Sequence, residues 1–281
     1  MNKNIFNLVL GTAQLDKDYS LSRKGLSVHN FKRIIKYAKK NKNFFIDTAL
    51  GYKNSEKVLS KFDLSSFKII TKFKNKKNLV KKLLNSKKKL RIKKFYGVLF
   101  HDEKKLLKQD PKEFLDLKKS LKDHNITFKI GVSVYTLKNL KLILKKFNID
   151  LIQLPANVFD KRFLNKKLLK IFNQKKIQIF ARSVFLKGVL INKKFRNKRL
   201  SNFKTNFVNY ERWLNKENIS NQKYFCINFI LANKINNIVI GFEDFNEYKE
   251  ILKFKKESYV NPPNFVKNQS DKNRLLRPDL W

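Results

Sequence analysis

Four polar residues at or just beyond the ends of apolar runs could together carry out acid–base chemistry. Asp47 ends the run FFID, and Tyr52 follows it by five residues. Lys72 ends the run KIITK, and His101 ends GVLFH. A polar group buried without a partner costs roughly 1–3 kcal/mol, so each of these groups should find partners nearby. Because the carboxyl ends of parallel strands meet at one rim of a barrel, the pattern predicts a single catalytic site there.

These side-chain types suit the reduction of a carbonyl group, the reaction that the family resemblance set out below implies. Hydride addition leaves an alkoxide, so an acid must protonate the oxygen as its charge develops. A free phenol has a pKa of about 10, which is too high for efficient acid–base work at neutral pH. We expect Lys72 to lower the pKa of Tyr52, with Asp47 as the counter-ion of the ammonium group. His101 could orient the carbonyl oxygen, and a cofactor must supply the hydride.

Strand-like and helix-like patterns alternate along the 281 residues. Short apolar runs predict strands at residues 5–11, 44–48, 67–72, 95–101, 128–133, 150–154, 177–183 and 237–241. Amphipathic spacing and capping residues predict helices at 29–41, 54–61, 76–90, 163–174, 218–234 and 244–255, with two more beginning at Asp110-Pro111 and at Thr136. A longer excursion spans about 185–216.

Eight strands, each followed by a helix, predict an α/β fold, namely a single-domain (β/α)8 TIM barrel. We expect the barrel to span residues 1–258 and an irregular tail, 259–281, to pack on it. A doubly wound sheet is the competing architecture. No GxGxxG motif follows the first predicted strand, which argues against a Rossmann domain.

The charge is strongly positive, with 65 Lys and Arg against 22 Asp and Glu. Such an excess is typical of proteins that bind nucleic acid or anionic membranes. The lysines are spread through every predicted helix, so we favour a lysine-coated surface without a specific nucleic-acid partner; a polyanion-binding protein is the alternative. No apolar run approaches the roughly 20 residues of a membrane span. With one cysteine, Cys226, and too short an apolar stretch at the amino terminus for a secretion signal, the sequence predicts a cytoplasmic protein.

The motifs resemble those of the aldo/keto reductase superfamily over residues 5–255. The family pattern of Asp-Thr-Ala, a Tyr five residues after the Asp, and Asn-Ser-Glu is matched within residues 47–56. Its lysine after the third strand matches Lys72, and its histidine after the fourth strand matches His101. The resemblance implies Asp47, Tyr52, Lys72 and His101 as catalytic residues. It also implies that NADPH or NADH reduces an aldehyde, ketone or sugar-type carbonyl.

The resemblance further implies contacts to the nicotinamide. Ser133 and Gln153 match the family residues that hold its carboxamide, but Val134 stands where the family has an Asn. Arg182, followed by Ser183, stands where the family usually has an aromatic side chain on the nicotinamide. A planar guanidinium could stack in its place. A loop ion pair is the alternative for Arg182.

The family's phosphate site follows the eighth strand, where this chain has Gly241, Glu243, Asp244 and Glu247. A helix amino terminus there would favour a phosphate through its N–H groups and dipole. Members that prefer NADPH usually have Lys, Ser and Arg at these positions. Carboxylates repel a 2′-phosphate but accept hydrogen bonds from a ribose, so we expect a weakened preference for NADP and use of NADH. The alternative is that these acids are helix-start residues facing solvent.

Two further motifs bear on the substrate. The segment ARSVFLKG and the closing RPDLW resemble bacterial members found with surface-polysaccharide and sugar biosynthesis enzymes, which implies a sugar-like substrate. Strand-end loops carry Phe73, Phe159, Phe185 and Leu186, which predict a partly apolar pocket mouth. The expected partner is a small carbonyl compound, bound by a monomer or weak oligomer without a metal. A non-catalytic nicotinamide-binding subunit or sensor of the same fold is an alternative.

Overall fold

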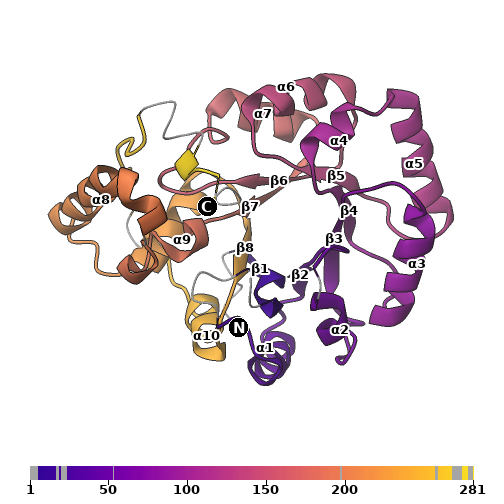
Figure 1. The fold of residues 1–281 in the computed structure, drawn as a ribbon, viewed down its shortest axis with the longest axis horizontal. Helices are drawn as coiled ribbons and strands as arrows, with labels where there is room; N and C mark the ends of the chain where they lie inside the picture. The colour runs from indigo at the N-terminus through magenta and orange to yellow at the C-terminus, as the bar shows by residue number, and fades with distance from the viewer. Residues whose placement is uncertain are drawn as a thin grey trace.

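Eight parallel strands close into a barrel in the computed structural model (Figure 1). The structure describes residues 6–16, 19, 24–52, 54–196, 198–256, 259–267, 274–277 and 281. The strands are β1 (Asn7–Gly11), β2 (Phe45–Asp47), β3 (Lys68–Phe73), β4 (Gly97–Phe100), β5 (Ile130–Ser133), β6 (Leu151–Pro155), β7 (Gln178–Arg182) and β8 (Asn237–Gly241). β8 pairs with β1 from Asn237 opposite Asn7 to Gly241 opposite Gly11, which closes the ring. The predicted (β/α)8 architecture is confirmed.

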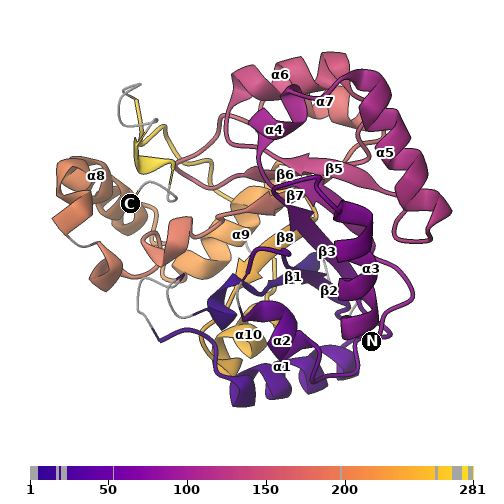
Figure 2. The same cartoon turned by 45° about the vertical axis from the view of Figure 1, so that its right-hand side comes forward.

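Helices surround the ring of strands on its outside (Figures 1 and 2). They are α1 (Val28–Lys40), α2 (Ser55–Leu59), α3 (Leu79–Leu90), α4 (Glu103–Leu107), α5 (Pro111–Asp123), α6 (Leu137–Lys146), α7 (Lys166–Gln174), α8 (Lys204–Lys216), α9 (Gln222–Ala232) and α10 (Phe245–Leu252). The sequence did not predict α4, or α8 within the excursion after β7. α4 is too short to show a periodic apolar face, and α8 lies in a stretch that we expected to be irregular.

Two helix starts follow the predicted capping chemistry. The carboxylate of Asp110 accepts a hydrogen bond from the Lys112 amide at 2.7 Å, and Pro111 occupies the first turn of α5, where its missing N–H costs nothing. The hydroxyl of Thr136 accepts from the Asn139 amide at 3.3 Å at the start of α6. Local side chains therefore set these starts before any tertiary packing.

The inward faces of the strands divide into an apolar layer and a polar layer. The apolar layer is a cluster of buried side chains: Val9, Phe45, Ile70, Leu99, Leu151 and Phe180. Side chains two residues apart on a strand share a face, so the residue two positions later lies above each of these toward the carboxyl ends. Those residues are Gly11, Asp47, Lys72, His101, Gln153 and Arg182. The barrel thus has a packed floor and a polar layer at the carboxyl-terminal rim.

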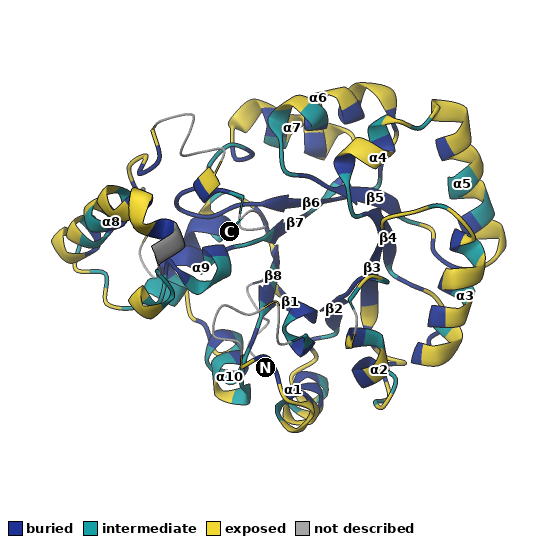
Figure 3. Cartoon of the chain, viewed as in Figure 1, coloured by how far each residue is buried: buried dark blue, intermediate teal, exposed yellow. Residues whose placement is uncertain are grey.

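A second apolar core lies between the barrel and the helices. Buried residues face inward from the helices, while exposed residues cover their outer sides (Figure 3). Close backbone approach also shapes the ring, because a Cβ added at Gly131 of β5 would lie 1.9 Å from the Leu151 carbonyl oxygen of β6. None of the helices in the described part of the chain combines the length and the apolar character needed to cross a membrane.

The described residues of the tail contact several other elements. The ring of Phe265 lies 5.3 Å from that of Tyr210 in α8, and the Phe265 carbonyl accepts a hydrogen bond from Asn206. Val266 is buried. Of the closing RPDLW motif only its first and last residues, 277 and 281, are described; the other three lie outside the described residues, as does position 258. The division of the chain after residue 258 stays a prediction.

Candidate active site

The structure brings Asp47, Tyr52, Lys72 and His101 together at the carboxyl-terminal rim. Asp47 ends β2, Lys72 lies near the end of β3, and His101 directly follows β4. The Tyr52 ring lies 6.0 Å from the His101 ring in a T-shaped arrangement. The Lys72 ammonium lies 5.5 Å from the centre of the Tyr52 ring. Four residues spread over more than fifty positions of the sequence therefore share one site.

Asp47 and Lys72 form a buried ion pair. The Lys72 ammonium donates to both carboxylate oxygens of Asp47, at 2.7 and 2.6 Å, and to the Thr48 carbonyl at 2.8 Å. An ammonium has three N–H donors, so all three are used. Gln153 also donates to Asp47, at 2.8 Å. Lys72 is 2 % exposed, so the pair lies almost entirely out of water.

The expectation that Lys72 lowers the pKa of Tyr52 is wrong for this structure. Burial raises the pKa of Tyr52 above the usual value for a phenol, and the negative charge of Asp47 raises it further. Arg182 opposes both effects. The physical reason is that the charge of Lys72 is compensated by Asp47 and its three donors point to other acceptors. Tyr52 is therefore a protonated phenol at neutral pH, the form that can give up a proton.

His101 is an uncharged imidazole in this site. Burial lowers the pKa of His101 to about 3, and the positive charges of Lys72, Lys74 and Arg182 contribute. Within the described part of the chain, no hydrogen-bond partner reaches its buried Nδ1 atom. A neutral imidazole can donate one hydrogen bond to a carbonyl oxygen without transferring charge. The geometry therefore fits an orienting group better than a proton donor.

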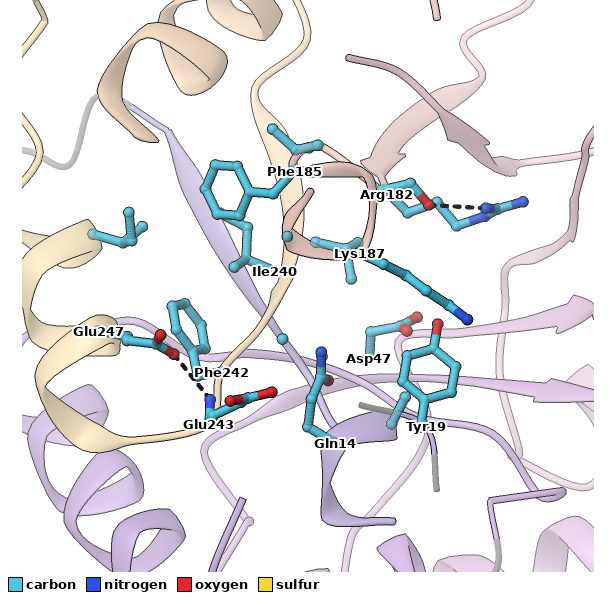
Figure 4. Close-up of a pocket in the computed structure, with 18 of the residues that line it drawn as sticks. Gln14, Tyr19, Asp47, Arg182, Phe185, Lys187, Ile240, Phe242, Glu243 and Glu247 are labelled. Carbon is cyan, nitrogen blue, oxygen red and sulfur yellow. Dashed lines mark hydrogen bonds between the residues drawn. The ribbon is translucent and has the colours of Figure 1, made fainter. Parts of the chain in front are cut away.

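A cavity of about 190 Å³ leads from Asp47 and Tyr52 to the end of β8 (Figure 4). Gln14, Tyr19 and Lys187 also line it. These three residues were not predicted because each lies in a segment between a strand and the next α-helix that carries no periodic pattern; Gln14 and Lys187 lie in single 3-10 turns. Their only signal is their position shortly after a strand end, where barrel sites are built.

The cavity is partly apolar, with Phe195, Ile240 and Phe242 among its lining residues, but most of the residues expected to make it so lie elsewhere. Phe185 lines the cavity, whereas Phe73, Phe159 and Leu186 are buried in the core between the barrel and the helices. Phe159, for example, stacks on Phe207 of α8 at 5.6 Å. Aromatic residues in strand-end loops can face the site or the surrounding helices, and the sequence does not distinguish these directions.

The model of the aldo/keto reductase family matches residues 7–259. The chain belongs to the aldo/keto reductase family. Family membership supports an NAD(P)H-dependent oxidoreductase that acts on a small carbonyl compound. No curated protein matches the chain.

Two solved structures show the fold that this family member shares with them. The aldo-keto reductase AKR11C1 from Bacillus halodurans in its holo form has a TM-score of 0.68 at 13% identity, covering 96% of this chain and 91% of that one. The glycerol dehydrogenase AKR11B4 from Gluconobacter oxydans has a TM-score of 0.66 at 16% identity, covering 96% and 90%. At these identities the likeness concerns the fold alone.

The residues around the cavity fit a nicotinamide nucleotide only after a side chain moves. Sites for drug-sized ligands have about 300–1,000 Å³, which is more than this cavity offers. The Gln14 amide lies directly on Gly241, where an added Cβ would lie 1.9 Å from the Gln14 Oε1 atom. The contact comes from the end of a side chain and not from backbone, so Gln14 could move aside when a nucleotide binds.

The residues expected to hold the nicotinamide already have protein partners. Gln153 donates to Asp47, and Ser133 accepts from the Arg182 Nε atom at 3.3 Å. The Arg182 guanidinium lies 4.0 Å from the centre of the Tyr135 ring and donates to Ser183 at 3.3 Å. Arg182 is therefore not in a loop ion pair with any described carboxylate, and its stacking on a nicotinamide stays a prediction.

At the expected phosphate site at the start of α10, three backbone N–H groups already donate to side chains of the same segment. Asp244 accepts hydrogen bonds from the Asn246 and Glu247 amides at 2.7 and 3.0 Å, and Glu247 accepts from the Glu243 amide at 3.0 Å. Burial raises the pKa of Glu247, which is half-buried rather than turned fully to solvent. The chain's own carboxylates therefore occupy these three amides, and a phosphate site at the start of α10 stays a prediction.

Proposed function

We propose that this protein reduces an aldehyde, ketone or sugar-type carbonyl to an alcohol, with Tyr52 as the general acid. The observation that supports this most directly is the meeting of Tyr52, His101 and the Asp47–Lys72 ion pair at one rim. NADPH or NADH supplies the hydride when bound. The Tyr52 phenol donates its proton to the alkoxide oxygen, and the neutral His101 imidazole holds that oxygen in place.

The Asp47–Lys72 pair does not by itself favour the phenolate form of Tyr52, because Asp47 compensates the ammonium charge and its own charge raises the pKa of the phenol. When the phenol gives up its proton, a phenolate forms in a site with little water. The charge of Arg182 attracts this phenolate, since Arg182 opposes the rise in the pKa of Tyr52. Asp47 keeps Lys72 charged and fixed. Proton return from solvent restores the phenol.

We infer NADH as the preferred nucleotide. The carboxylates of Asp244 and Glu247 occupy three amides at the start of α10, so a 2′-phosphate would meet negative charge and few donors. A ribose hydroxyl pair could instead donate to a carboxylate such as Glu243, which lines the cavity.

The sugar-like substrate is also a proposal. Its support is the ARSVFLKG motif, part of which lines the cavity. A role in surface-polysaccharide or sugar biosynthesis is consistent with such a substrate. The glycerol dehydrogenase named above also takes a polyol, although its likeness to this chain concerns the fold.

The test is a Tyr52→Phe variant in an assay of NADH and NADPH oxidation with small aldehydes, keto sugars and nucleotide-linked sugars. Loss of the acid proton should lower kcat/KM by roughly 10²–10⁴-fold and leave the cofactor Kd unchanged. Tyr37→Phe in α1 is the matched control, since it removes the same hydroxyl away from the site. A normal rate in the Tyr52 variant would refute the role of this phenol. A native protein that binds the cofactor but reduces no compound would favour the non-catalytic subunit or sensor.

A further inference from the structure

Positive charge gathers at the end of the cavity that holds Tyr52. The cationic rim consists of Arg182, Lys187 and Arg277. Lys187 reaches from the loop after β7 to within 5.6 Å of the Tyr19 ring centre, and Arg277 of the tail lies 4.5 Å from the centre of the Tyr135 ring. Figure 4 shows Arg182 and Lys187 toward the same end as Asp47 and Tyr19.

The negative charge of the cavity lies elsewhere or is already used. Among the described lining residues the carboxylates are Asp47, Glu243 and Glu247. Asp47 is engaged by Lys72 through both oxygens. Glu243 and Glu247 lie at the opposite end of the cavity (Figure 4). Among the described lining residues, no carboxylate other than the engaged Asp47 lies at the end of the cavity toward which Arg182 points.

Arg182 is the member of the rim whose contacts are fully defined. Its Nη2 atom donates to the Val134 carbonyl at 3.0 Å, and its other two contacts, with Ser133 and Ser183, are long at 3.3 Å. All three acceptors are neutral oxygens. No described carboxylate lies within 4.0 Å of it, in contrast to Arg162, which pairs with Asp160 at 2.6 Å.

The guanidinium of Arg182 is held in place by protein contacts and keeps N–H donors that these contacts do not use. Its central carbon lies over the Tyr135 ring, 4.0 Å from the ring centre. A guanidinium has five N–H donors, and the contacts above use three. Its charge reaches the reacting groups, since it lowers the pKa values of both Tyr52 and His101. A rigid, uncompensated guanidinium beside the reacting groups suits bidentate binding of an anion.

We infer that the substrate of the proposed reduction carries an anionic group, a carboxylate or a phosphate, and that Arg182 binds it beside Tyr52. This inference rests on the proposed function. Lys187 and Arg277 add attraction at longer range, which speeds the encounter with an anionic substrate. Arg182 is thus a specificity-determining residue, and it selects charged carbonyl compounds over neutral ones of the same size.

The kinetic test compares matched pairs of carbonyl compounds with the native protein and an Arg182→Gln variant. One pair is glyceraldehyde 3-phosphate and glyceraldehyde, and the other is succinic semialdehyde and butanal. We expect kcat/KM to favour the anionic member of at least one pair, by roughly tenfold or more, and the variant to lose that preference. The pair that shows the preference distinguishes phosphate from carboxylate. Arg212→Gln on the exposed side of α8 is the control for lost charge.

Two kinetic results would overturn the inference. One is a native protein that reduces the neutral member of each pair at least as well as the anionic member. The other is a variant that loses the same factor with both members, which would mean that Arg182 acts on Tyr52 or holds the loops after β5 and β7 and does not bind the anionic group. The cofactor Kd is measured in parallel. A variant defect confined to cofactor binding would assign Arg182 to the nucleotide and also refute the inference.

A binding measurement separates this inference from the proposed function. Succinate and inorganic phosphate are titrated calorimetrically into the native protein and into both variants. We expect at least one anion to bind the native protein and the Arg212 variant roughly tenfold more tightly than the Arg182 variant. This result would support the anion site even if no carbonyl compound is reduced. Equal binding by all three proteins, or none at all, would refute it even if reduction occurs.

Discussion

Replacing Asp47 with Asn would leave a positive charge without compensation in the interior of the barrel. Lys72 is 2 % exposed, and Asp47 supplies two of its three hydrogen-bond acceptors, at 2.6 and 2.7 Å. Removing one partner of a buried ion pair costs about 3–5 kcal/mol, because the other charge stays buried alone. The free energy of unfolding of a typical domain is about 5–15 kcal/mol. We therefore expect Asp47→Asn to remove a large fraction of the stability.

The free energy of unfolding is measured by urea denaturation, followed by circular dichroism. Glu113→Gln is the control, since it breaks the exposed Lys76–Glu113 pair at 2.9 Å, where we expect a loss of about 0–1 kcal/mol. An Asp47→Asn/Lys72→Met double variant removes both charges and should be more stable than Asp47→Asn alone. If Asp47→Asn lowered the free energy of unfolding no more than Glu113→Gln, Lys72 would have lost its proton or reached water in the variant. That result would refute a charged Lys72 left buried without a partner.

Two further predictions concern pH and cofactor. Because the pKa of His101 is lowered to about 3 and that of Tyr52 is raised, both groups stay uncharged from about pH 5 to 8. The pH profile of kcat/KM for carbonyl reduction should therefore be flat in this range. The reverse reaction, alcohol oxidation, needs the phenolate and should become faster as the pH rises. An inflection in the reduction profile near pH 6.5 would contradict the assignment of His101 as a neutral imidazole. Titration by protein fluorescence should show tighter binding of NADH than NADPH, and Glu247→Gln should reduce the difference by removing a charge near the ribose; tighter binding of NADPH by the native protein would refute the preference.

Much of the site could be anticipated because its residues end strands. Asp47, Lys72 and His101 each follow an apolar residue two positions earlier, and the alternation of a strand places both on one face. Eight parallel strands in a closed ring then leave only one rim on which these side chains can meet. The gathering of these residues at one rim can therefore be predicted from strand order and alternation alone. Which atoms touch within the rim does depend on distances.

The details of the site depended on contacts between loops. Arg182 stacks on Tyr135 because the loop after β5 folds beside the end of β7, and no pattern near either residue indicates this. Phe159 packs on α8, whose position follows from the long excursion after β7. Loop conformations come from packing against distant segments, so the local sequence carries little information about them.

The sequence by itself determined the barrel, the order of its strands and the set of residue types at the rim. These follow from local alternation, capping and chain order, which are properties of neighbouring residues. Only the tertiary structure decided the electrostatics. It showed that Asp47 and Thr48 take all three donors of Lys72, that burial raises the pKa of Tyr52, and that Asp244 and Glu247 fill the amides of α10. The reason is that a pKa and a hydrogen bond depend on distances between groups and on access of water, which chain order does not fix.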